Sequence, residues 1–225
     1  MTLHGALGSR GQLGAVLGTQ RGGSALPWWN PDGATPAANT AAWCAKGAPS
    51  LAGSYVNLGL LGYPNIDPTA VGGVAPNWDA LLGWTTPGAR YLKSGVVPTA
   101  THSLLVQYSS AVSNCLVGSY NGGSTRFGVY SPSGIYMYGG NSIGTVASNG
   151  NRAVSEPSGY LNGIFDIALG TFLGVGAELY ILARNRADIG GIDAYYVGNL
   201  QALVIYNVLL SSAQIGLRAA AMAAL

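Results

Sequence analysis

Charged side chains are scarce in this sequence. Aspartate, glutamate, lysine and arginine together make up 8% of its 225 residues, whereas an average globular domain contains about 25%. The formal net charge is +2, and the ten lysines and arginines are scattered along the chain. Because proteins that hold nucleic acid through its phosphates need clustered basic residues, this distribution argues against a nucleic-acid partner.

A surface so poor in charge has two explanations. Either uncharged polar residues, glycine and tyrosine make up the exposed surface, as on many extracellular β proteins, or neighbouring subunits cover much of it. We favour the second explanation. The expected partners are therefore other subunits of a virion or surface assembly, including copies of the chain itself in a homo-oligomer.

Long apolar runs are also missing. No segment reaches the roughly 20 consecutive apolar residues that cross a membrane, and residues 1–23 lack the uninterrupted apolar centre of a secretion signal. We expect no membrane partner. We expect the protein on a virion surface or outside the cell, which it would reach by a route such as release within a particle.

Few residues are suited to catalysis. Cys44 and Cys115 have neither zinc nor redox spacing, and they are either buried free thiols or a disulfide. A glycoside hydrolase needs two carboxylates about 5–10 Å apart, but Glu156 and Glu178 have no acidic residue two positions away. His102 precedes an apolar segment and is expected in a surface turn. No nucleotide-binding, nucleophile-elbow or zinc-protease motif is present, so we expect no enzyme.

Glycine is abundant, with 35 residues, and it marks an N-terminal arm. The apolar residues of segment 1–26 are isolated and follow no period of 2 or 3.6 residues. The arm therefore cannot bury enough apolar area alone to become ordered, and it needs a partner. Its predicted assembly anchors, together with two tryptophans that follow, are Leu7, Leu13, Val16, Leu17, Trp28 and Trp29.

The segment from 27 to 50 places Trp28, Trp29 and Trp43 among turn residues. These large rings are expected to pack onto the edge of the domain that follows. We assign 1–50 to the arm and the tryptophan segment, and 51–225 to one domain, a length that suits a single β-sandwich.

Short apolar runs broken by turn residues fill the domain, which is typical of a sandwich or barrel. Tight turns are expected at 121–123 (NGG), 131–134 (SPSG) and 149–151 (NGN). The expected strands are SYVNLGL, ARYLKSGVV, HSLLVQYSS, NCLVGSY, RFGVYS, GIYMYGG, GTVASN, GYLNGIFDIAL, AELYILARN, AYYVG and NLQALVIYNV.

Two segments predict how the last elements pack. In 102–110, Leu104, Val106 and Tyr108 alternate with mostly polar residues, so one face of this strand is apolar. The strand at 199–208 is apolar on both faces and should be central or covered on both sides. Ser211 or Ser212 can then cap a C-terminal helix rich in alanine, with a buried stripe at Ile215, Met222 and Leu225.

The ending GNLQALVIYNVLLSSAQI resembles the final strand and helix of the concanavalin-type lectin/glucanase jelly roll in its laminin-G-like form. The stretch from Ala75 to Val97 is similar to the opening strands of versions found in bacteriophage and metagenomic phage-like proteins, where W-D, G-W and Y-L-x-x-G-V recur. The resemblance covers residues 52–217. It implies an all-β, two-sheet antiparallel jelly-roll sandwich, here with an extended N-terminal arm and a short C-terminal helix.

Two candidate sites follow. Calcium is common in the family that the chain resembles, and Asp188 and Asp193, with Asn185, could supply oxygens. The alternative is that Asp188 pairs with Arg186 and Asp193 caps a turn. No cofactor is otherwise expected. The candidate glycan-binding residues are Tyr130, Tyr136, Tyr138 and Asn141, because Tyr136 and Tyr138 share one strand face and could form an aromatic platform; the alternative is that they pack in cross-strand pairs.

The preferred interpretation is a non-enzymatic structural virion protein of a bacteriophage that assembles through its N-terminal arm. It would decorate or cement a capsid, or form a subunit of a tail or fibre. The alternative is a carbohydrate-binding, lectin-like module on a viral or cell surface. The fold hosts both kinds of protein, so the residues of a site must decide between them.

Overall fold

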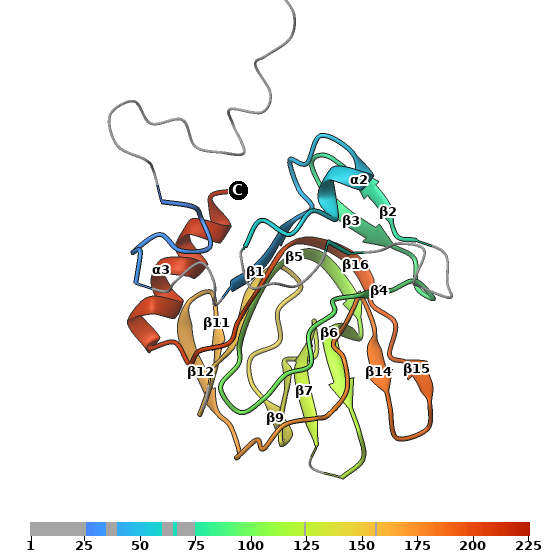
Figure 1. The fold of residues 1–225 in the computed structure, drawn as a ribbon, viewed down its shortest axis with the longest axis vertical. Coiled ribbons are helices and arrows are strands. Elements are labelled where there is room, and N and C mark those ends of the chain that lie inside the picture. Colours follow the sequence, from blue (N-terminus) through green and yellow to red (C-terminus); the bar gives the residue numbers. More distant parts are fainter. Residues whose placement is uncertain (1–25, 35–39, 60–64, 67–74, 124, 156) are drawn as a thin grey trace, which may run out of the picture.

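Two β-sheets packed face to face form the body of the protein in the computed structural model (Figure 1). The structure describes residues 26–34, 40–59, 65–66, 75–123, 125–155 and 157–225. Nearly all strand pairs are antiparallel, so the expected all-β sandwich is confirmed. No helix among these residues is long and apolar enough to cross a membrane.

The first sheet, sheet A, has the strand order β12-β11-β10-β5-β16-β3-β2, and β1 pairs with the second half of β16. Its eight strands are β1 (Thr40–Cys44), β2 (Asn77–Asp79), β3 (Gly83–Thr86), β5 (Ser103–Ser113), β10 (Gly150–Ser155), β11 (Ser158–Leu161), β12 (Ile164–Ala168) and β16 (Val197–Tyr206).

The second sheet, sheet B, has the order β15-β14-β6-β7-β8-β9, and β13 pairs with β6 and β4. Its strands are β4 (Leu92–Lys93), β6 (Cys115–Tyr120), β7 (Arg126–Tyr130), β8 (Ile135–Tyr138), β9 (Gly140–Ile143), β13 (Tyr180–Ile181), β14 (Arg184–Arg186) and β15 (Gly191–Asp193). Within the described residues, the helices are α2 (Leu51–Ser54) and α3 (Ser212–Ala223).

Strand alternation divides β5 and β16 between two cores. Leu104, Val106 and Tyr108 point between the sheets, as expected from the sequence, and join the main core. Leu105 and Val204 point to the other side of sheet A, where they form a second apolar cluster beneath α3. The expectation that the last strand is central and covered on both faces is therefore confirmed.

Helix α3 begins where the sequence predicts. The Ser211 side chain accepts the backbone amide of Gln214, and the Gln214 side chain accepts the amide of Ser211, so that a capping box closes the first turn. Ile215 and Met222 are buried on sheet A. Gly163 in the β11–β12 turn allows the helix to approach closely, since a Cβ there would lie 3.0 Å from the Ala219 Cβ.

Residues 27–34 of the tryptophan segment lie on this outer cluster beside α3, where Figure 1 shows them in blue. Arg218 of α3, 1% exposed, forms an ion pair with Asp32, and the Tyr206 hydroxyl donates to the carbonyl of Trp29. Trp28 and Trp29 pack on the cluster as expected. Trp43 differs, because it lies in β1 and is fully buried in the main core. The sandwich therefore includes residues 40–44, ahead of the expected start at residue 51.

Several expected strands are wrong in detail. The first expected strand, 54–60, is wrong, because helix α2 ends at Ser54 and residues 55–59 lie in no strand. Segment 144–149 forms no strand either, and Gly150 and Asn151 belong to β10 instead of a hairpin loop. The hairpin turn lies at 162–163, within the segment expected to be one strand. Cys44 and Cys115 are free and buried, so the disulfide alternative is wrong.

Candidate functional site

The expected tyrosine platform is not exposed. Tyr136 and Tyr138 do share one face of β8, but that face points into the main core and their exposures are 0% and 1%. The Tyr138 hydroxyl donates to the backbone carbonyl of Ala100, and the Tyr136 hydroxyl shares its proton between the Tyr160 carbonyl and the Asp166 carboxylate. The two rings are therefore packing residues, and this part of the glycan-site expectation is wrong.

A buried arginine explains why Tyr136 points inward. Arg152 of β10 is fully buried; its guanidinium donates to the Tyr136 hydroxyl at 3.0 Å and to the Thr145 carbonyl at 2.6 Å, and lies 3.7 Å from Asp166. Burial alone would raise the pKa of Asp166, but hydrogen bonds from Thr145 and Tyr136 and the charge of Arg152 hold it below its usual range. This network satisfies the phenol inside the sandwich.

Tyr130 and Asn141 do come together, on the outer face of sheet B. They line an open depression of about 290 Å³ together with Asn114, Ile135, Met137, Arg184 and Ala194. Tyr130 is only 8% exposed, whereas Asn141 is exposed. The floor requires Gly118, because a Cβ there would lie 2.6 Å from the Cys115 Sγ and 2.7 Å from the Met137 Cε.

Three arginines surround one tyrosine beside this depression. The guanidinium carbons of Arg126, Arg184 and Arg186 lie 4.8, 5.4 and 5.0 Å from the centre of the Tyr120 ring. These distances are within the range of cation–π attraction, which fixes the side chains against the sheet. We name this surface, Tyr120 and the three arginines with the adjoining depression, the basic face.

Two aspartates neutralise part of the basic face. Asp193 accepts from Arg184 at 2.7 and 2.5 Å and from Arg186 at 3.0 Å, and Asp188 accepts from Arg186 at 2.8 and 2.9 Å. Burial would raise the pKa of Asp193, but the hydrogen bonds of Arg184 and Arg186 hold it below its usual value. The expected pairing of Asp188 with Arg186 is confirmed, whereas Asp193 forms ion pairs in place of the expected turn cap.

Arg126 has no carboxylate partner among the described ion pairs. Its Nη1 donates to the Asn141 Oδ1 at 2.9 Å, and its Nη2 donates to the Gly123 carbonyl. With three arginines and two aspartates, the basic face carries one excess positive charge next to the depression.

The calcium candidates do not form a ligand set in the described part of the chain. Asp188 and Asp193 are bound by arginines, and the Asn185 amide donates to the carbonyl of Glu178. Nowhere in the described ranges do three or more histidine, cysteine, aspartate or glutamate side chains gather in a way that could hold a metal.

Of the residues weighed for hydrolysis, the structure describes Glu178 and His102, and neither lines the depression of the basic face. The Glu178 carboxylate accepts the backbone amide of Gly95, and Glu156 lies outside the described residues. His102 is buried and its Nδ1 accepts the amide of Thr99, so the expected surface position is wrong although the turn exists. The arm residues Leu7, Leu13, Val16 and Leu17 also lie outside the described residues.

Sequence reasoning missed Tyr120, Arg126 and Arg184 as members of one surface. A signal was available for part of it: Arg184 and Arg186 are two residues apart in a strand, so they share a face. Tyr120 and Arg126 flank the NGG turn, which brings them onto neighbouring strands. Nothing in the sequence shows that β14 lies parallel beside β6, which joins the two pairs.

No family model and no curated protein matches this chain. Among solved structures, it is similar to the NanB sialidase of Streptococcus pneumoniae (15% identity, TM-score 0.40, 56% of this chain and 26% of the sialidase). The chain thus spans about a quarter of that sialidase. It is also similar to a carbohydrate-binding module of the Ruminococcus gnavus IT-sialidase bound to α2,6-sialyllactose (14%, TM-score 0.41, 54% and 84%). A third is domain 4 of a Geobacillus stearothermophilus arabinanase in complex with arabinotriose (18%, TM-score 0.37, 57% and 71%).

Proposed function

We propose that the chain is a non-enzymatic carbohydrate-binding module and that its basic face holds the sugar. The observation that carries the proposal is the depression beside Tyr120, where amide, guanidinium and aromatic groups converge on an open surface of sheet B. Sugar hydroxyls both donate and accept hydrogen bonds, so they need fixed partners of both kinds.

The depression offers both kinds of partner. The Asn141 Oδ1 is held by Arg126, which leaves its amide hydrogens directed away from that bond. The Asn114 amide donates to the Tyr195 carbonyl at 3.1 Å, which leaves its Oδ1 as an acceptor. Ile135 and Met137 add apolar surface against which the carbon-bound hydrogens of a sugar ring can pack.

The excess charge favours a glycan that carries an acidic group. Arg126 can turn one guanidinium edge toward a carboxylate without breaking an ion pair, since the described residues give it none. Guanidinium groups bind carboxylates through two parallel hydrogen bonds, which gives them specificity as well as strength.

The structural virion interpretation stays a prediction. It depends on the arm and on assembly with other subunits, and the arm lies outside the described residues. The basic face is made only of described residues and therefore supports the binding module, which sequence reasoning held as the alternative.

A glycan array carrying matched neutral and acidic oligosaccharides tests the proposal with the full chain. Acidic glycans are expected to bind, and Arg126→Ala is expected to lower their affinity about tenfold, because a hydrogen bond to a charged group contributes about 1.5–3 kcal/mol. Calorimetry measures the change.

Lys46→Ala is the matched control. It also removes one positive charge, but Lys46 follows β1 in sheet A and lies outside the basic face. Equal losses in both variants, or no glycan binding by the native chain, would contradict the proposal.

A further inference from the structure

A second open surface lies on the outer face of sheet A, beyond the part that α3 covers. Four polar residues stand in register on adjacent strands: Asn77 of β2 pairs with Thr85 of β3, Thr85 with Asn199 of β16, and Asn199 with Ser109 of β5. We name these four residues the polar row. At about 4.8 Å between strands, the polar row spans roughly 14 Å across the sheet.

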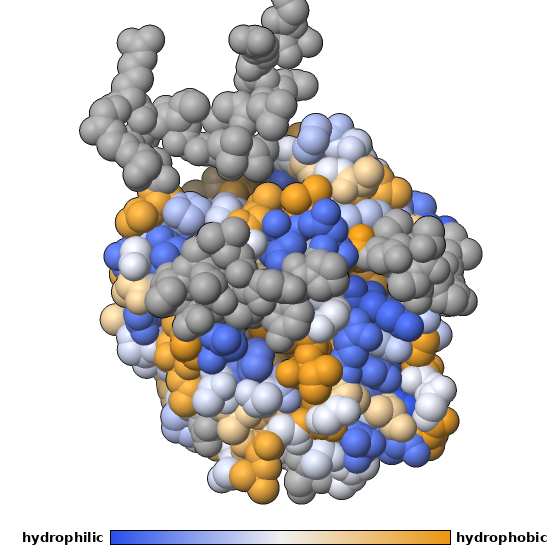
Figure 2. Space-filling view, in the orientation of Figure 1, coloured by the Kyte–Doolittle hydropathy of each residue, from blue (hydrophilic) through white to orange (hydrophobic). Residues whose placement is uncertain are grey.

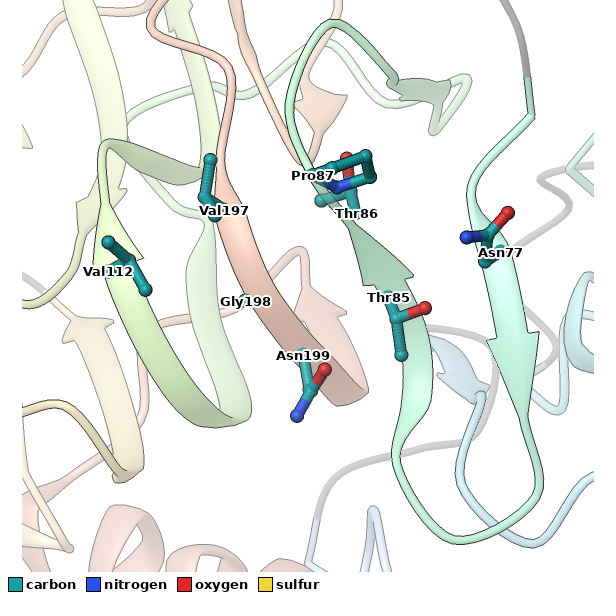
Figure 3. A pocket seen from close by; sticks show the side chains of 8 residues that line it. All are labelled: Asn77, Thr85, Thr86, Pro87, Val112, Val197, Gly198 and Asn199. Atoms are coloured by element: carbon teal, nitrogen blue, oxygen red, sulfur yellow. The ribbon is translucent and has the colours of Figure 1, made fainter.

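The neighbouring row shows which way the polar row faces. Trp84, Leu200 and Tyr108 pair in the same order one position along the strands, and all three are fully buried in the main core. Because successive side chains of a strand point to opposite faces, the polar row points to solvent. Figure 3 shows three of its residues, Asn77, Thr85 and Asn199, on three adjacent strands.

An open depression of about 340 Å³ includes three residues of the polar row, Asn77, Thr85 and Asn199. It is lined by Asn77, Thr85, Thr86, Pro87, Val112, Val197, Gly198 and Asn199, none of which is charged (Figure 3). Val112 is 69% exposed, although it is apolar. The lining thus combines amides and hydroxyls with exposed apolar side chains.

The amides of the polar row are held in fixed orientations. Arg90 donates to the Asn77 Oδ1 at 2.7 Å, which leaves the Asn77 amide hydrogens as donors. The Asn199 amide donates to the Ser109 Oγ at 3.3 Å, which leaves the Asn199 Oδ1 as an acceptor. Thr85 lies between them, and its hydroxyl, which makes no hydrogen bond to another described residue, can donate or accept.

We propose that the polar row is a second binding site, separate from the basic face, and that it takes an uncharged oligosaccharide laid across strands β2, β3, β16 and β5. Along the row, Asn77 offers a donor, Thr85 a hydroxyl and Asn199 an acceptor, so sugar hydroxyls find partners of both kinds. Arg90, a charged residue, lies at the edge of the polar row and donates to the Asn77 Oδ1 and the Ala75 carbonyl. The side chains that line the depression itself are uncharged, which favours a ligand bound through neutral hydrogen bonds. The span of roughly 14 Å across four strands suits a chain of sugars better than a single sugar.

The array for this site carries cello-, malto-, manno-, xylo- and arabinotriose beside sialylated and uronate-containing glycans. The native chain is expected to bind at least one neutral trisaccharide. A variant with Asn77→Ala, Thr85→Val and Asn199→Ala is expected to bind it at least tenfold more weakly, since three neutral hydrogen bonds are lost. The same variant keeps its binding to acidic glycans.

Thr85→Val alone provides the second test, because valine has nearly the shape of threonine and suits a strand. It is expected to weaken neutral binding about two- to tenfold. Thr101→Val, which removes an exposed hydroxyl outside sheet A, is the control and leaves binding unchanged. Thermal melting checks that each variant is folded.

Three results would overturn the inference: no neutral trisaccharide binds, the triple variant binds it as well as the native chain, or Arg126→Ala abolishes the same binding. If the native chain binds a neutral trisaccharide but no acidic glycan, the proposed function of the basic face is refuted and the inference about the polar row is not.

Discussion

The basic face and the polar row are built on the same sandwich but differ in how their polar groups are satisfied. On the basic face, guanidinium groups pair with Asp188 and Asp193 and pack on the Tyr120 ring. On the polar row, the Asn199 amide donates to the Ser109 hydroxyl, and the Asn77 Oδ1 accepts from Arg90 at the edge. Side chains on the outer faces of a sandwich need not be apolar or fill the core. One fold can therefore carry two surfaces of different chemistry.

Hydrophilic and hydrophobic residues are interspersed on the face of the molecule that Figure 2 shows, and no single apolar area dominates it. The apolar residues that do gather on the outside of sheet A lie under α3 and the tryptophan segment. Among the described residues, this cover lies over one part of sheet A, and the depression along the polar row lies beyond it.

The largest effect is expected from the core that both surfaces share. Trp84→Ala removes a fully buried ring beneath the polar row and leaves the Ser54 hydroxyl without its indole donor. Such truncations cost about 3–5 kcal/mol of unfolding free energy. Urea unfolding measures the loss, and Trp84→Phe, which keeps most of the apolar volume, should lose clearly less. A change below about 1 kcal/mol would contradict the assigned packing.

The next effect concerns the network that keeps Tyr136 inside. Arg152→Met leaves Asp166 without its buried guanidinium and is expected to cost about 3 kcal/mol at neutral pH. Adding Asp166→Asn removes the charge left behind and should restore part of the loss. If the double variant is no more stable than the single one, the two side chains are not coupled.

A smaller effect is the response of stability to acid. The folded-state pKa of Asp166 and of Asp193 lies below its usual value, because arginine and hydroxyl or amide donors outweigh burial. Their stabilisation is therefore complete above the unfolded-state pKa, near 3.9, and is lost as pH falls through the folded-state values. Unfolding free energy should decline below about pH 4. In the double variant Arg152→Met with Asp166→Asn, the unfolding free energy should fall less steeply with acid. An unchanged slope would contradict the contribution of Asp166.

The smallest effect separates the two surfaces by salt. Binding of an acidic glycan to the basic face should weaken a few-fold between about 0.05 and 0.5 M sodium chloride, since exposed charges are screened over this range. Binding of a neutral trisaccharide to the polar row should not change. Calorimetry at the two concentrations measures both, and a salt-dependent neutral ligand would contradict the uncharged character of the polar row.

Local patterns in the sequence predicted elements whose two faces differ. Alternation over 103–110 identified the inward residues of β5, and the capping serine and buried stripe identified α3. The pattern could not orient β8, because Ile135 and Met137 on one face are as apolar as Tyr136 and Tyr138 on the other. The outcome depends on Arg152 and Asp166, which are distant in sequence and meet Tyr136 only in the folded chain.

The two candidate sites were harder to predict for a related reason. Each depends on register between strands that are far apart in the sequence. Thr85 and Asn199 are neighbours only because β3 pairs with β16, and Arg184 reaches Tyr120 only because β14 pairs with β6. The spacing of residues along one segment does not show which distant strand lies beside it. The sequence therefore pointed to Tyr130 and Asn141 but not to Tyr120, Arg126 and Arg184 beside them.

The most direct test of two separate surfaces is a chemical-shift titration of the full chain with one acidic and one neutral oligosaccharide, each alone and then together. The acidic ligand is expected to shift the amides of Tyr120, Arg126 and Asn141, and the neutral ligand those of Asn77, Thr85 and Asn199. Each should bind as tightly in the presence of the other. Shifts of the same amides by both ligands, or displacement of one by the other, would contradict the existence of two sites.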